Sequence, residues 1–164
     1  MLRETKRAVL LALIAIISAC QSQPVTYYTP PTGIPLEDSA TFIGSKVPIR
    51  NIFFTDEITY VRRIDDFPVE DGSKSYDMPV QVSPGKHTIE VGFAQGSGCA
   101  NAVFEVNAES RRTYITRSEK LAREGLFRLQ NLRIWIEDSE GNKVTDDAIV
   151  PFSYCGGGFG FIFV

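Results

Sequence analysis

The residues with the chemistry for covalent or catalytic work are few: the thiols of Cys20, Cys99 and Cys155, and the imidazole of His87, the one histidine of the chain. A thiolate beside a histidine can act as a nucleophile, with the imidazole as its base. Cys99 and Cys155 can instead form a disulfide if the protein is exported to an oxidising compartment. The compartment therefore decides which chemistry is open to these thiols.

Residues 1–19 predict export. Residues 1–7 carry three basic side chains, residues 8–17 are all apolar, and Ser18 and Ala19 follow. A basic start, a short apolar run and a small-residue site are typical of a secretory signal peptide. Ten residues of helix span about 15 Å, half of the roughly 30 Å hydrocarbon core, so this run is too short for a transmembrane helix.

The segment Ile17-Ser18-Ala19-Cys20 resembles the lipobox of bacterial lipoproteins, in which an aliphatic and two small residues precede the cysteine that begins the mature chain. The resemblance implies a diacylglycerol and an N-acyl chain on Cys20, which together hold a protein firmly on a membrane. Gln21 stands where Asp would resemble an inner-membrane retention signal. We therefore expect a lipid anchor in the outer membrane, with the domain in the periplasm.

The mature chain is acidic. Loss of residues 1–19 removes three basic residues and one acidic residue, so 17 basic and 20 acidic residues become 14 and 19, a net charge of −5. Nucleic-acid binding draws on clustered Lys and Arg, so this balance argues against nucleic acid as a partner. The 145 residues that remain suffice for one domain with its own core.

Residues 20–40 are predicted to form the lipidated N-terminus and a flexible tether. They contain four prolines and no periodic apolar pattern, a composition that favours extended chain at about 3.1 Å per residue. Such a tether would reach on the order of 60 Å from membrane to domain. A tyrosine pair such as Tyr27 and Tyr28 commonly packs on the flank of a domain.

Residues 41–164 predict an all-β domain. Apolar, β-branched or aromatic runs recur about every ten residues between turn residues, which predicts an antiparallel β-sandwich of about seven to nine strands. The predicted strands are 57–64, 78–82, 87–93, 102–106, 113–116, 126–137, 143–150 and 156–164.

Three connections are predicted to be hairpin turns. Residues 83–86 ("SPGK") give the clearest signal, because the proline sets φ and the glycine takes a positive φ. Residues 107–110 and 138–142 are the other two. One short helix is predicted at residues 118–125, with a serine as its cap and a glycine at its end.

In an exported protein the pair Cys99 and Cys155 predicts a disulfide. Closing a loop of about 57 residues would stabilise the fold by roughly 4 kcal/mol. The alternative is a catalytic dyad of one cysteine with His87, and no sequence feature brings these residues together. One histidine and two distant cysteines also make a poor zinc site. The sequence therefore predicts no metal, no cofactor and no catalytic residue.

Three stretches occur in the order of a known family, over about residues 55–118. They resemble the elements "I-D-G-x-P-V", "L-x-P-G-x-H-x-I-x-V" and "V-x-A-G-x-x-Y" of small bacterial lipoproteins with a PEGA-like β-sandwich. The stretches that carry the likeness are Val61–Val69, Val82–Val91 and Phe104–Tyr114. Asp66 and Glu109-Ser110 stand where the family has glycine. The resemblance implies a sandwich in the cell envelope without catalytic residues, and it makes His87 a turn residue.

The sequence thus predicts a non-catalytic outer-membrane lipoprotein that serves as an accessory or interaction module of the envelope. Exposed strand edges or the aromatic C-terminal strand are the expected contact surface for another envelope protein. The alternative is a module that binds a glycan or a peptidoglycan fragment, with Trp135, Tyr154 and His87 as candidate binding residues. An enzyme that uses a cysteine and His87 is the third hypothesis.

Overall fold

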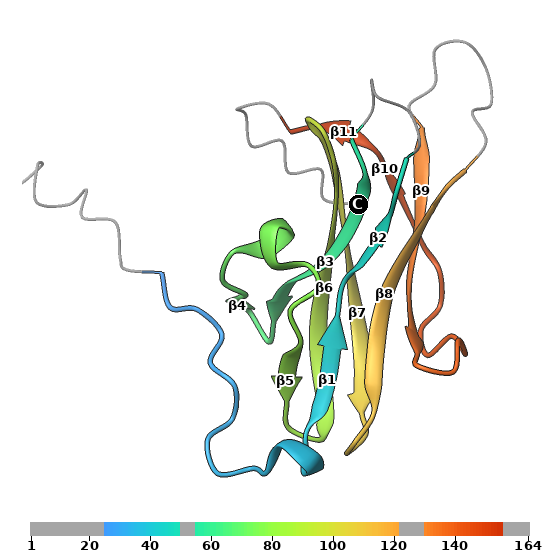
Figure 1. Cartoon of the computed structure of the whole chain (residues 1–164). Coiled ribbons are helices and arrows are strands. Elements are labelled where there is room, and N and C mark those ends of the chain that lie inside the picture. The colour runs from blue at the N-terminus through green and yellow to red at the C-terminus, as the bar shows by residue number, and fades with distance from the viewer. Residues whose placement is uncertain (1–24, 50–54, 122–129, 156–164) are drawn as a thin grey trace, which may run out of the picture.

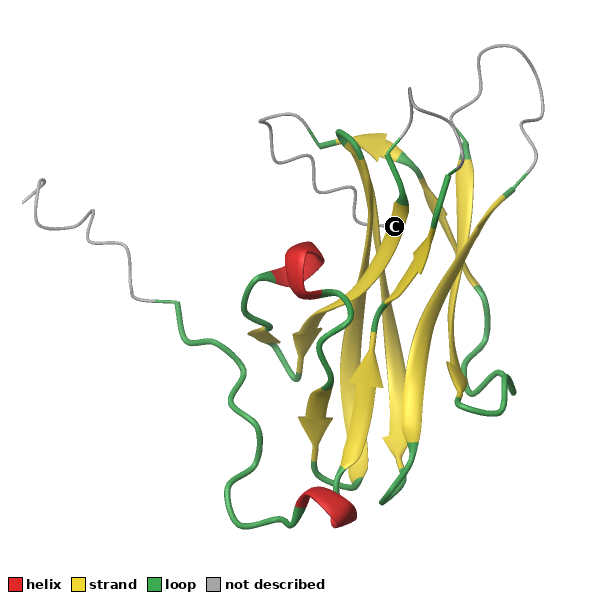
Figure 2. Ribbon diagram, in the orientation of Figure 1, coloured by secondary structure: helices red, strands yellow, loops and turns green. Residues whose placement is uncertain are grey.

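The fold is described from a computed structural model, in which residues 25–49, 55–121 and 130–155 are placed. Two β-sheets pack face to face (Figures 1 and 2), which confirms the predicted all-β sandwich. Eleven strands form over the described residues, more than expected, because strands of two to four residues carry too little apolar pattern to be recognised. Cys20 and the predicted final strand, 156–164, lie outside the described residues.

The first sheet has the strand order β10-β9-β8-β1-β5 and the second β11-β7-β6-β3-β2, with β4 paired to β3. All neighbouring strands are antiparallel except β1 and β8, which run parallel. The first sheet contains β1 (Ala40–Ile43), β5 (Val80–Val82), β8 (Thr113–Lys120), β9 (Asn131–Asp138) and β10 (Ala148–Pro151). The second contains β2 (Ser45–Val47), β3 (Glu57–Ile64), β4 (Phe67–Pro68), β6 (Gly85–Gln95), β7 (Gly98–Ala108) and β11 (Ser153–Tyr154). Two short 3₁₀ helices are η1 (Leu36–Asp38) and η2 (Gly72–Ser75).

The core lies between the sheets and follows from the period of two along each strand. On β7 and β9 every even-numbered side chain from Ala100 and Leu132 onward is buried, and most of the odd-numbered ones reach solvent. Phe42 stacks on Tyr114 with ring centroids 4.8 Å apart. Phe93 meets the edge of Phe152 at 5.7 Å, and this contact links the end of the second sheet to the segment that leaves β10.

Two of the three predicted hairpins are wrong. β5 lies in the first sheet and β6 in the second, so residues 83–86 turn the chain between sheets. The same holds for β7 and β8, which flank the predicted turn at 107–110. Turn chemistry specifies that the chain reverses, but it does not specify whether the flanking strands pair with each other. The third hairpin is confirmed, since β9 and β10 pair around 138–142.

The predicted helix at 118–125 is also wrong where it can be compared. Residues 118–120 belong to β8, where each is paired with a residue of β9, and residues 122–125 lie outside the described part of the chain. Tertiary pairing overrides a helical propensity that extends over barely two turns.

β1 and β2 are a single stretch of chain that changes sheet at Gly44. A Cβ atom at Gly44 would overlap the carbonyl oxygens of Thr59 and Tyr76, so the crossing requires glycine. Beside it, the buried hydroxyls of Ser45, Thr59 and Thr116 are hydrogen-bonded to one another at 2.8 and 2.9 Å. The two sheets are therefore joined here by both covalent chain and buried polar contacts.

The described part of the predicted tether is docked on the domain. The backbone N–H of Tyr28 donates to the Pro68 carbonyl at 2.8 Å, and its hydroxyl donates to the Gln81 carbonyl at 2.9 Å. Burial, and then the nearby Asp65 carboxylate, raise the pKa of Tyr28 above its ordinary value of 10.0. From Cys20 to Tyr28 the chain can span at most roughly 28 Å, about half of the predicted reach.

Candidate functional site

Cys99 and Cys155 form a disulfide, as the sequence predicts, with their Cα atoms 5.8 Å apart. The bond fastens the chain after β11 to the start of β7, where Ser153 pairs with Cys99. The N–H of Cys155 donates to the Ser97 carbonyl at 2.7 Å, so Cys155 lies beside the β6–β7 turn. Neither thiol is available as a nucleophile.

His87 lies far from both cysteines. It pairs across the ladder with Val106, whereas Cys99 pairs with Ala94. Seven residues of β6 separate the two positions, roughly 23 Å at about 3.3 Å per residue. The structure therefore does not bring together the residues of the alternative cysteine–histidine dyad.

His87 instead holds a turn. Its Nδ1 donates to the Asp65 carboxylate at 2.6 Å, and its Nε2 lies 2.8 Å from the carbonyl oxygen of Ser83 but 3.5 Å from the Ser83 hydroxyl. Nε2 thus points at a backbone acceptor, which suits a turn-capping histidine and not a base that activates a hydroxyl. The other Asp65 oxygen accepts the N–H of Thr88 at 2.9 Å. This cluster clamps the β3–β4 turn to β6.

The two aromatic candidates lie on different sheets. Trp135, on β9, donates to the Glu137 carboxylate at 3.2 Å, and the ammonium of Lys143 lies 4.7 Å from the centre of its ring. One ring face is therefore covered by a cation. Tyr154, on β11, is 75 % exposed beside the disulfide. Trp135, Tyr154 and His87 do not form a common binding surface.

The edges of the two sheets differ, and this difference singles out a candidate surface that contains none of those residues. Three of the four edges are short or blocked: β5 has three residues and follows Pro79, β2 has three residues and precedes Pro48, and β10 has four and ends at Pro151. Natural sheets protect their edges by such means.

β7 is the exception. It has eleven residues and is covered by β11 only at Gly98 and Cys99. Along Ala100–Ala108, no described residue pairs with its outer edge. This stretch, which we call the open edge, contains no proline, no lysine and no bulge in its pairing with β6. It therefore has none of the protective features seen on the other edges.

The β6–β7 turn determines which backbone groups face outward. Gln95 and Gly98 pair around the two-residue turn Gly96-Ser97, and hydrogen-bonded and non-bonded pairs alternate from there along the ladder. Every second residue from Ala100 therefore bonds to β6. The residues between them direct their N–H and C=O groups away from β6, and they are Asn101, Val103, Glu105 and Asn107.

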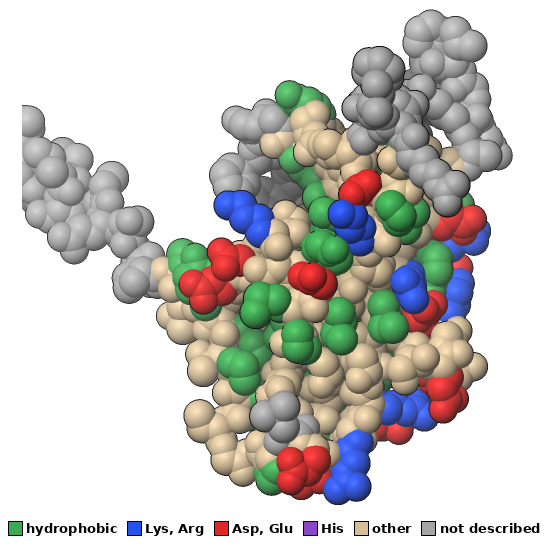
Figure 3. Space-filling model, in the orientation of Figure 1, with side chains coloured by type: hydrophobic (Ala, Val, Ile, Leu, Met, Phe, Trp, Pro, Cys, Tyr) green, Lys and Arg blue, Asp and Glu red, His purple; other side chains and the backbone are tan. Residues whose placement is uncertain are grey.

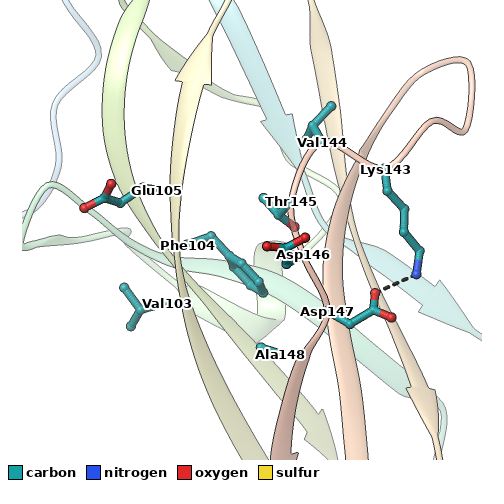
Figure 4. Close-up of a pocket in the computed structure, with 9 residues that line it drawn as sticks. All are labelled: Val103, Phe104, Glu105, Lys143, Val144, Thr145, Asp146, Asp147 and Ala148. Carbon is teal, nitrogen blue, oxygen red and sulfur yellow. Dashed lines mark hydrogen bonds and ion pairs between the residues drawn. The ribbon is translucent and has the colours of Figure 1, made fainter.

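A groove of about 750 Å³ lies against the open edge. It is lined on one side by residues 103–105 of β7 and on the other by residues 143–148, the segment that leads into β10 (Figure 4). Phe104, 7 % exposed, points across the groove toward Asp146, while Val103 is 63 % exposed. The volume is in the range of natural ligand pockets. A groove with free strand groups on one wall can accept an extended chain.

The groove carries uncompensated negative charge. Asp147 pairs with Lys143 at 2.6 Å and with Arg133 at 3.4 Å. Glu105 and Asp146 make no ion pair with any residue in the described part of the chain. A ligand here would therefore meet acceptors for a basic group.

The sequence predicts a strand edge as a contact surface but not this one, because the predicted pairing of 102–106 with 113–116 would have covered it. The signal is visible in the chain: eleven residues without proline or lysine, in which polar or exposed positions alternate with apolar ones. Comparison with protein-family models, curated proteins and solved structures finds no match. Within the described ranges, no cluster of residues could hold a metal ion, and no helix is long and apolar enough to cross a membrane.

Proposed function

We propose that this chain is a lipid-anchored, non-catalytic interaction module of the bacterial outer envelope, and that it contacts its partner through the open edge. The observation that carries the proposal is the contrast between that long, unblocked edge and the short or blocked edges elsewhere. The lipobox-like segment at Ile17–Cys20, the disulfide and the PEGA-like order of motifs support an envelope location.

The docked tether gives the module a defined position. Because Tyr28 is bonded to the domain, an acyl group on Cys20 would keep the sandwich within roughly 28 Å of the membrane surface. A partner would then be met close to the membrane, in the space that an accessory subunit of an envelope assembly occupies. The face that carries the N-terminal segment shows separate hydrophobic groups among polar and charged ones (Figure 3), not one continuous apolar patch.

The anchor is tested with Cys20→Ser, using Ser22→Ala as the matched control outside the lipobox. The full-length chains are produced in a Gram-negative host fed alkyne-tagged palmitate, and the membranes are separated by density. We expect label and outer-membrane sedimentation for wild type and Ser22→Ala, and neither for Cys20→Ser. Label on all three chains, or on none, would contradict the lipoprotein assignment.

The interaction role is tested with a photoreactive phenylalanine analogue placed at Val103 or at Trp135 and irradiated in intact envelopes. We expect one polypeptide adduct in near-stoichiometric yield from position 103 and none from position 135. Muropeptide adducts at position 135 would favour the glycan-binding alternative, and equal adducts from both positions would contradict a role for the open edge.

A further inference from the structure

We infer that the open edge binds an extended peptide segment of the partner as an added antiparallel strand, with a Lys or Arg of that segment opposite Glu105. The inference rests on the proposed role as an interaction module, and it names the chemistry of the partner. It follows from three features of the open edge: the free backbone groups, the Glu105 carboxylate, which has no ion-pair partner among the described residues, and an exposed apolar position.

The backbone groups determine the mode of binding. Asn101, Val103, Glu105 and Asn107 direct their N–H and C=O groups outward at about 6.6 Å intervals, the repeat of two strand residues. An extended peptide presents groups of the same spacing, whereas a helix has no free backbone groups along its length. The ladder can therefore continue from β7 into a bound strand.

The Glu105 carboxylate determines the charge of the bound segment. Glu105 lies on the strand and Asp146 on the facing wall of the groove (Figure 4), and neither has an ion-pair partner among the described residues. β7 itself contains no basic residue. Glu105 points to the exposed face of the sheet, away from Phe104 and Asp146 (Figure 4), so a residue paired opposite it meets the Glu105 carboxylate alone. A basic side chain there would be attracted, and a glutamate would be repelled.

The apolar position determines the order of residues in the partner. Val103 lies two residues before Glu105, so the two side chains share one face of the sheet. In an antiparallel partner the residue opposite Glu105 precedes the residue opposite Val103 by two. The favoured segment therefore has the pattern basic, any residue, apolar, read from its N-terminus.

Two other possible occupants of the open edge, the end of this chain and a second copy, fit less well. The end of this chain, 156–164, has no basic residue to place opposite Glu105. A second copy paired edge to edge would offer Glu105 no basic residue, because β7 contains none.

The test uses the mature chain, both acylated in detergent and as Cys20→Ser. The probe is a fluorescent nonapeptide of serine and threonine with lysine at its fifth position and valine at its seventh, and anisotropy measures binding. We expect the lysine peptide to bind about fivefold tighter than its glutamate counterpart, since the exchange turns the attraction of an exposed pair into a repulsion. Glu105→Lys should reverse the preference.

Backbone pairing is tested by changes in the protein and in the probe peptide. Val103→Pro removes an N–H that faces outward, and should weaken binding at least about tenfold, whereas Val103→Thr keeps the N–H and should bind like wild type. Equal unfolding temperatures show that both variants fold. N-methylation of the peptide at the lysine and every second residue should abolish binding, and N-methylation of the residues between should not.

Equal affinity for the lysine and glutamate peptides, or equal effects of the two N-methylated peptides, would overturn the inference. So would dimerisation of the free chain that Val103→Pro abolishes, which would assign the edge to a second copy. Much tighter peptide binding by a chain ending at Cys155 would assign it to residues 156–164. Acylation is read at Cys20 and peptide binding at Val103 and Glu105, so the two proposals can fail separately.

Discussion

The two long sides of the sandwich are built differently. On one side, which we call the closed side, β1 runs directly into β2 through Gly44, and Tyr28 donates to carbonyls of both β4 and β5. On the other, the open side, β7 and β10 lie next to each other without pairing, and only the two residues of β11 bond to the edge of β7. The N-terminal segment covers edges on the closed side, and nothing in the described ranges does so along Ala100–Ala108.

The difference shows how one fold can be stable and still have a surface for binding. The closed side joins the sheets by continuous chain through Gly44, by buried hydroxyl contacts and by the docked N-terminal segment. On the open side the chain also crosses between sheets, from β10 to β11 through Phe152. The open side has a covalent clamp at one end, the Cys99–Cys155 disulfide, and leaves most of the strand beyond it free. A free edge promotes aggregation unless it has an intended partner.

The largest expected effect on stability comes from removing the disulfide of the open side. Replacing Cys99 and Cys155 together by Ala should lower the free energy of unfolding by about 4 kcal/mol, because the reduced chain regains the entropy of a loop of about 57 residues. Urea unfolding of the variant and of wild type measures the loss. Wild type under reducing agent is the control and should match the variant. A loss under about 1 kcal/mol would show that β11 and the core contact of Phe152 hold this end without the bond.

A smaller effect is expected where the N-terminal segment contacts the closed side. Tyr28→Phe removes the hydroxyl that donates to Gln81 and keeps the ring, so it should cost about 1 kcal/mol. Hydrogen exchange of residues 25–35 should become faster, while exchange along β6 and β7 stays as in wild type. Tyr27→Phe is the matched control, since Tyr27 is 47 % exposed and makes no hydrogen bond to any described residue. Equal exchange in both variants would mean that this hydrogen bond does not hold the N-terminal segment on the domain.

Features of the closed and open sides could not be predicted equally well from the sequence. The class of fold follows from apolar alternation, and β3, the β9–β10 hairpin and the disulfide were predicted from local signals. The two sheet-crossing turns were not, because residues 83–86 and 107–110 have the chemistry of hairpin turns while their flanking strands diverge between layers. The open edge depends on that divergence. Whether β7 pairs with β8 is decided by the packing of the whole sandwich, and no segment of the chain specifies it alone.

The smallest expected effect is in the β9–β10 turn of the open side, and it depends on pH. Asp138 accepts the N–H groups of Asn142 at 2.9 Å and Glu140 at 3.0 Å. The bond from the Asn142 backbone is the largest cause that lowers the pKa of Asp138 below its ordinary value of 3.8. A carboxyl whose pKa is lower in the folded state stabilises the fold above its unfolded pKa, and the contribution is lost as the pH falls through the folded pKa. Wild type should therefore be more stable than Asp138→Asn at neutral pH, and the gap should close as the pH falls below 3.8.

Urea midpoints from about pH 7 to about pH 2 measure this difference in stability. The control is Asp146→Asn, which changes a carboxylate without an ion pair in the described structure and should leave the midpoint close to that of wild type. A gap for Asp138→Asn that stays constant down to about pH 2 would mean that the turn is held by its backbone bonds alone, and that the end of the open side opposite the disulfide is not sensitive to charge.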